Sequence, residues 1–161
     1  MIEVNQLIIP AARKGEIDVL RELISQGADL NLHGEKGYTP LIIACYNEQY
    51  NAAKLLLEHG AHPDGQDDGG NTALMGASFK GYNGIVQLLI DHKANLNLQH
   101  GNGGTALMFA CMFGRNEIVQ LLLRNGADKS IKDFRGLSAR DLAQQQDNTK
   151  AIELLDTYMK G

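Results

Sequence analysis

Apolar and polar positions along this chain recur with a period of 33 residues. One alanine keeps its register through five copies, at Ala11, Ala44, Ala77, Ala110 and Ala143. A Gly-x-Thr opening precedes this alanine in three copies, in the segments 37–44, 70–77 and 103–110, and a weaker version stands at 136–139. A fixed period of 20 to 50 residues is typical of a solenoid, in which each unit packs on its neighbours.

Each full repeat predicts two helices. In the second copy Thr39 suits the N-cap position and Pro40 suits the first helical position, so a helix is expected from there to about Asn47. A second apolar run begins at about Tyr50 and stops at Gly60, a residue type that readily ends helices in the left-handed conformation. One such pair leaves its apolar face uncovered, so the core has to form by stacking of successive pairs.

The period divides the chain into five copies, of which the outer two are atypical. Their approximate boundaries are 1–33, 34–66, 67–99, 100–132 and 133–161. In the last copy Arg140 stands in the column of Leu41, and Asp156 stands in the column of Leu57. Polar residues in otherwise apolar columns indicate a solvent-facing terminal cap. We therefore expect residues 1–161 to form a single all-α domain with no second domain after it.

The pattern Gly-x-Thr-Pro-Leu, then Ala, then Ile-Val-x-Leu-Leu-Leu and Gly-Ala-Asp, resembles the ankyrin-repeat family over nearly the whole chain. The resemblance implies an ankyrin-repeat solenoid of stacked antiparallel helix pairs, with β-hairpin loops projecting at right angles. It also implies a non-catalytic module that binds other proteins through its loop tips and the concave face of its first helices.

Two positions depart from the pattern of the neighbouring repeats. Lys93 stands where the other copies have the helix-stop glycine, which predicts a left-handed backbone at a non-glycine residue. Gly76 stands inside a helix, in a column that is otherwise filled by large side chains. We expect Phe109, in the next repeat, to reach into the space left there.

The charge and the length of the apolar runs restrict the partners. The formal net charge is −4 and the pI is near 5.7, which argue against nucleic acid and anionic membrane surfaces, because both require a basic face. Apolar runs are too short to span a bilayer, and the first residues lack the shape of an export signal. A cytoplasmic protein is expected, unless a leader was removed.

Only two cysteines occur, Cys45 and Cys111, at the same point of repeats that lie two periods apart. Stacked helices are roughly 8–10 Å apart, which separates these residues by about 20 Å. A disulfide needs Cα atoms within about 7 Å, so no intramolecular bridge is expected. This agrees with a reducing compartment.

Three segments are candidates for a catalytic or ligand-binding site. The run 67–71 lacks the ligand spacing of a calcium loop, and the glycine-rich run 101–104 lacks the strand and the Gly-Lys-Ser/Thr of a phosphate loop. His59 and His62 have no third ligand at a fixed spacing. We expect no cofactor and no metal, and an enzyme or metal-dependent regulator is the disfavoured alternative.

One group of side chains has the composition of a protein interface. Two columns at the ends of the first helices carry large or charged residues, and the loop tips add polar and aromatic ones. The predicted partner-binding residues are Glu35, Lys36, Tyr38, Tyr46, Asn47, Asp68, Asn71, Phe79, Lys80, Asn102, Met112, Phe113, Phe134 and Arg135. The apolar members of the columns are expected to anchor the partner, and the charged residues are expected to set its register.

Two alternatives remain open for this group. Phe79 and Met112 could instead be partly buried core residues. The apolar stripe could also bury itself in a homodimer, although a monomer that binds another protein is favoured. The sequence does not identify that protein.

Overall fold

The computed structural model describes residues 3–158, which form ten α-helices and one short 3-10 turn. The first helices of the pairs are α1 (Val4–Lys14), α3 (Pro40–Tyr46), α5 (Ala73–Lys80), α7 (Ala106–Met112) and α9 (Ala139–Gln145). The second helices are α2 (Ile17–Ser25), α4 (Tyr50–Glu58), α6 (Asn83–Asp91), α8 (Asn116–Arg124) and α10 (Thr149–Thr157). The 3-10 turn is η1 (Glu35–Gly37).

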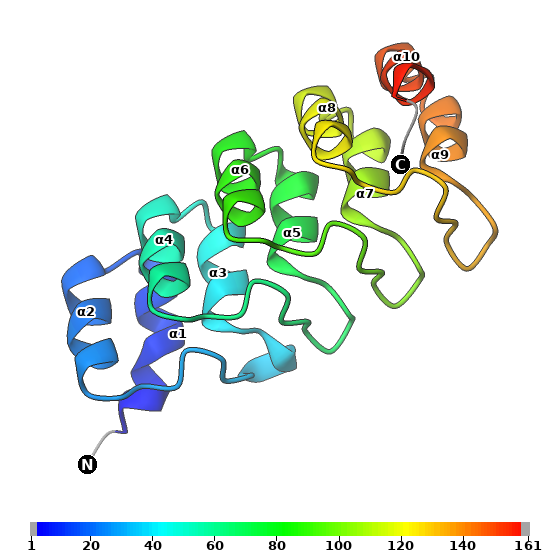
Figure 1. Ribbon diagram of the computed structural model, residues 1–161. Helices are drawn as coiled ribbons and strands as arrows, with labels where there is room; N and C mark the ends of the chain where they lie inside the picture. Colours follow the sequence, from blue (N-terminus) through cyan, green and yellow to red (C-terminus); the bar gives the residue numbers. More distant parts are fainter. Residues whose placement is uncertain (1–2, 159–161) are drawn as a thin grey trace.

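The helix pairs stack in sequence order and form two layers (Figure 1). Each first helix packs against the first helices of the neighbouring repeats, and each second helix packs against its own partner and against the neighbouring second helices. Long loops connect the pairs and project to one side of the stack (Figure 1). The predicted all-α solenoid is confirmed.

Threonine caps start the first helices of the three full repeats. The hydroxyl of Thr39 accepts a hydrogen bond from the backbone N–H of Ile42, and Pro40 follows at the first helical position. Thr72 and Thr105 accept the equivalent bonds. Each cap satisfies one of the donors that the first turn of a helix leaves unpaired. The helix start predicted in the second copy is therefore confirmed.

Left-handed residues end both helices of a repeat. After the second helices the column is Gly27, Gly60, Lys93 and Gly126, and Lys93 has a φ of 67°, which confirms the predicted strained backbone. After the first helices the column is Gly15, Glu48, Gly81, Gly114 and Asp147. Glu48 and Asp147 have φ values of 57° and 53°, so they carry the same strain as Lys93. The glycines at the equivalent positions, Gly15, Gly81 and Gly114, already indicated a left-handed backbone at Glu48 and Asp147.

The loops are joined from repeat to repeat by backbone hydrogen bonds at their tips. These bonds run from Asp68 N–H to Lys36 C=O, from Gly101 N–H to Gly69 C=O and from Phe134 N–H to Asn102 C=O. Over residues 3–158 the only β-pairing is an isolated bridge between Lys132 and Ser138. The loops thus have hairpin turns but no regular strands, and their tips are tied to one another along the stack.

The core is one continuous layer between the helices, and the alanine column lies at its centre with almost no exposure. Cys45 and Cys111 are buried free thiols within it. At the far end of the stack, Arg140 and Asp156 are both exposed and form an ion pair at 2.8 Å. The two polar residues predicted to mark a cap therefore pair with each other. No helix within residues 3–158 is long and apolar enough to cross a membrane.

Candidate functional site

Two hollows lie between the first helices and the projecting loops. The central hollow has a volume of about 490 Å³ and the C-terminal hollow one of about 520 Å³. The central hollow is lined by Arg13, Tyr38, Ile42, Ile43, Tyr46, Asp67, Asn71, Thr72, Ala73, Met75, Gly76, Phe79 and Phe109. The C-terminal hollow is lined by His100, Asn102, Gly104, Met108, Phe109, Met112, Asp133, Phe134, Arg135 and Leu142. Only Phe109 belongs to both sets, so it forms the wall between them.

The floor of the central hollow depends on the missing side chain of Gly76. A Cβ added to this residue would lie 3.2 Å from Cδ1 of Tyr46 and would meet no atom of Phe109 within 4 Å. The expectation that Phe109 fills the space beside Gly76 is therefore wrong. The ring of Tyr46, from the preceding repeat, lies there instead, because its position at the end of α3 brings it over the glycine.

Aromatic and cationic groups meet at the end of the central hollow where the first helices stop. The ammonium group of Lys80 lies 4.9 Å from the centre of the Tyr46 ring, within the range of a cation–π interaction. Phe79 and Phe113 pack edge to face, with ring centres 4.7 Å apart. Phe79 is half-buried, so part of its side chain packs against the protein and part of it faces the hollow.

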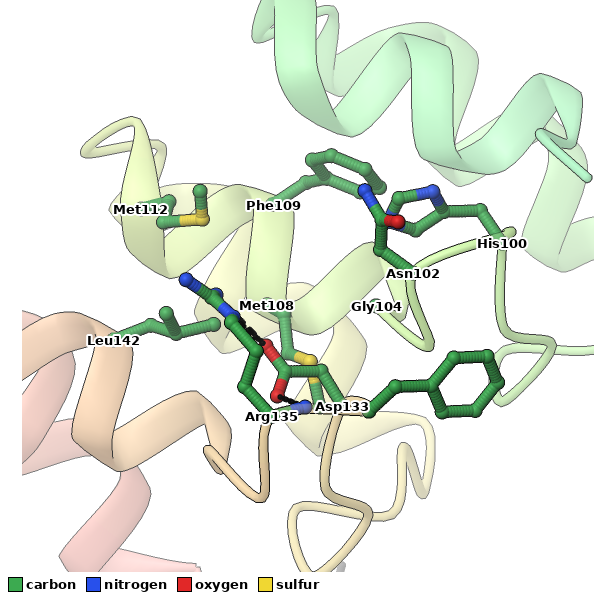
Figure 2. A pocket seen from close by; sticks show the side chains of 10 residues that line it. His100, Asn102, Gly104, Met108, Phe109, Met112, Asp133, Arg135 and Leu142 are labelled. Carbon is green, nitrogen blue, oxygen red and sulfur yellow. Dashed lines mark hydrogen bonds and ion pairs between the residues drawn. The ribbon is translucent and has the colours of Figure 1, made fainter. Parts of the chain in front are cut away.

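The C-terminal hollow contains an internally paired set of charges (Figure 2). The guanidinium of Arg135 donates to the carboxylate of Asp133 at 2.8 and 3.2 Å, and the backbone N–H groups of Arg135 and Leu137 donate to it as well. Burial alone would raise the pKa of Asp133, but these donors hold its pKa below the ordinary value. Asp133 is therefore ionised at neutral pH, and its charge is matched by Arg135.

His100 occupies the loop position that Asp67 and Asp133 hold in the neighbouring repeats. Its ring packs against Phe109 with centres 5.0 Å apart, and Figure 2 shows it on the wall of the C-terminal hollow. Burial lowers the pKa of His100, and the charges of Asp133 and Asp67 oppose that shift only in part. The imidazole is consequently neutral at pH 7.

Eight of the predicted partner-binding residues line one of the hollows. They are Tyr38, Tyr46, Asn71 and Phe79 in the central hollow, and Asn102, Met112, Phe134 and Arg135 in the C-terminal hollow. Six others line neither hollow: Glu35, Lys36, Asn47, Asp68, Lys80 and Phe113. Of these, Lys80 and Phe113 still contact lining residues, Tyr46 and Phe79 respectively.

Asn71 has a structural part in its loop. Its backbone N–H donates to Asp67 at 2.9 Å, and its side chain donates to the same carboxylate at 3.3 Å. The side-chain N–H groups of Asn71 are thus engaged within the loop. The remaining exposed surface of Asn71 borders the hollow.

Sequence reasoning missed several lining residues. Phe109 precedes Phe113 by four positions and therefore lies on the same side of its helix, which was a readable signal. Arg13 stands in the same column as Tyr46, two residues after the alanine column, although it is not among the predicted partner-binding residues. Met75 precedes Phe79 by four positions and so gave the same signal, but its column reads as core, and the residue is only 2% exposed. Asp133 gave no signal, because its role depends on a pairing within its loop.

Metal binding has no support in the geometry of the described residues. Within 3–158, no three His, Cys, Asp or Glu side chains come together in a way that could hold an ion. Burial raises the pKa of Cys111 to about 12 and that of Cys45 further, so both thiols stay protonated at neutral pH.

Comparisons with known proteins match this chain to a family model and to a viral protein. A family model described as Ankyrin repeats matches three times, over residues 7–100, 64–133 and 82–158. A stretch of 54 residues is 43% identical to the putative ankyrin repeat protein FPV024 of Fowlpox virus (strain NVSL). This stretch is 33% of the present chain and 9% of that relative, so the chain matches only a small part of the viral protein.

Proposed function

Because this chain belongs to the ankyrin-repeat family, whose repeats generally serve as protein–protein interaction modules, we propose that it is a non-catalytic module that binds a partner protein. The partner would dock on the central hollow and on the loops beside it. In this proposal residues 1–161 act as one domain, whose helix stack holds the lining residues in fixed positions.

The observation that carries the proposal is the apolar, aromatic-lined central hollow with an exposed tyrosine at its edge. Tyr46 is 44% exposed although its ring rests on Gly76 and is capped by Lys80. Aromatic residues in a concave surface that is rimmed by polar groups are the usual centre of a protein interface. Burial of this ring by a partner would remove apolar surface from water without any rearrangement of the helices.

The loop tips supply the polar rim. Their backbone bonds from repeat to repeat hold Lys36, Asp68 and Asn102 along one edge of the stack. Charged groups at such a rim favour the correct register of a partner and the rate of encounter more than they add to affinity.

A pair of matched tyrosine variants tests the proposal. Tyr46 lines the central hollow, whereas Tyr50, which is 43% exposed, lies at the start of α4 and lines neither hollow. Truncation of an interface anchor typically costs about 2 kcal/mol, or roughly thirtyfold in affinity. Tyr46→Ala should therefore lose a partner that the wild-type protein retains from native lysate, and Tyr50→Ala should keep it.

Thermal unfolding of both variants is the control, because both rings are exposed to the same extent and both variants should stay folded. Loss of the partner with Tyr50→Ala but not with Tyr46→Ala would place the interface on another face. Light scattering at several concentrations covers the homodimer alternative: a mass that doubles with concentration, and does so less readily in Tyr46→Ala, would identify the partner as a second copy.

A further inference from the structure

We infer that the central hollow accepts an aromatic side chain of the partner that stands next to an acidic residue. This inference rests on the proposed function and specifies the chemistry of the bound segment. It follows from three features of the hollow: its size and lining, the cations beside it that have no carboxylate partner, and the hydrogen bonds that the carboxylate of Asp67 already accepts.

The lining suits an aromatic group. Met75 and Phe79 come from α5, and Phe109 comes from α7, so two repeats enclose the space with polarizable and aromatic surfaces. Thioether sulfur and aromatic edges both favour contact with a further ring. The volume of about 490 Å³ lies within the range of pockets that bury small organic groups.

The cations at this hollow have no carboxylate partner. The described residues form two ion pairs, Arg135 with Asp133 and Arg140 with Asp156, and neither involves Arg13 or Lys80. Arg13 lines the hollow from the end of α1, and Lys80 stands over the Tyr46 ring at the end of α5. An anion bound beside the ring of Tyr46 would therefore find unpaired positive charge on this side of the hollow.

The carboxylate of the hollow is already occupied by donors. Asp67 accepts from the backbone N–H groups of Gly69 and Asn71 at 2.9 Å each, and from the side chain of Asn71. These bonds lie within its own loop and partly balance its charge, so it is a poor site for a cation from a partner. In the C-terminal hollow the charges of Asp133 and Arg135 cancel, so a preference for anions is expected only in the central hollow.

The methionines allow a direct test, because they report on the two hollows separately. Met75 lines the central hollow, whereas Met108 and Met112 line the C-terminal one. We propose NMR titration of the full chain, labelled with ¹³C at the methionine methyl groups, with three probes of similar shape. These are 3-phenylpropionate, the neutral 3-phenylpropanamide and the cationic 3-phenylpropylammonium.

The expected result is a saturable shift of the Met75 methyl signal with all three probes and tightest binding of the carboxylate. An exposed ion pair adds up to about fivefold in affinity, so the carboxylate should bind up to roughly fivefold tighter than the amide. Arg13→Gln and Lys80→Gln should each reduce the ratio of carboxylate affinity to amide affinity. Arg21→Gln, which removes an exposed cation from α2 away from the hollow, should leave this ratio unchanged.

Equal or tighter binding of the ammonium probe would overturn the inference, as would shifts confined to Met108 and Met112. These failures are distinct from a failure of the proposed function. A partner lost specifically with Tyr46→Ala would still stand if the hollow showed no preference for the anion. Conversely, probe binding without any effect of Tyr46→Ala on partner retention would refute the proposed function, although the preference of the hollow for an aromatic anion would stand.

Discussion

Replacement of Ser78 by alanine should make this protein more stable. Ser78 lies in the middle of α5 and is fully buried, and its hydroxyl has no hydrogen-bond partner among residues 3–158. In neighbouring repeats the same column holds Ala12, Cys45 and Cys111, all of which are buried, so the position accepts a side chain without a hydroxyl. Serine is thus the one residue of this buried column that brings an unpaired polar group into the core.

The magnitude follows from two effects of the same sign. A buried polar group without a partner costs about 1–3 kcal/mol, and serine in a helix interior costs roughly 0.5 kcal/mol relative to alanine. The small void left by the oxygen offsets part of this gain. We expect Ser78→Ala to raise the free energy of unfolding by about 1–2 kcal/mol, or roughly 2–4 °C in melting temperature for each kcal/mol at this chain length.

Urea and thermal unfolding measure the change, and two further variants sharpen it. Ser78→Cys restores the residue of two neighbouring repeats and should stabilise without leaving a void. Ser25→Ala is the control, because the hydroxyl of Ser25 is exposed and donates to the Glu22 carbonyl at 2.7 Å. Its effect should stay within about 0.5 kcal/mol. A lower midpoint for Ser78→Ala would show that the hydroxyl is paired, for example with a buried water, and would refute the reasoning.

Three other predictions concern the backbone, the thiols and the hollow. Lys93→Gly should raise the free energy of unfolding by up to about 1 kcal/mol, because it relieves a left-handed backbone at a non-glycine residue; a lowered unfolding midpoint would contradict this. Cys45 and Cys111 should react slowly with Ellman's reagent at pH 8 in the folded protein, since burial raises the pKa of each, and should give two thiols on unfolding; fast labelling of the native chain would contradict their burial. Gly76→Ala should weaken binding of the retained partner, because the added Cβ displaces the neighbouring tyrosine ring. Gly84→Ala, whose Cβ meets nothing within 4 Å, should leave the affinity unchanged, and equal effects of the two variants would argue against the central hollow.

The repeat, the helices and their ends were readable from the sequence because each depends on chemistry within a few residues. A threonine followed by proline starts a helix, and a glycine in register ends one. The same reasoning predicted the left-handed backbone at Lys93, because this residue stands in the column of the helix-stop glycines even though it is not a glycine. Glu48 obeys the same rule and could have been predicted from the glycines of its column.

The residues that line the two hollows were predictable only as a region, because their arrangement depends on distances between repeats. The ring of Tyr46 settles on Gly76, 30 positions along the chain, and Phe109 separates two hollows whose other walls come from different helices. A periodic pattern gives the side of a helix on which a residue lies, but not which neighbouring side chain fills the space beside it. That choice is made by close packing, in which the volume of each side chain fixes where the next one can go.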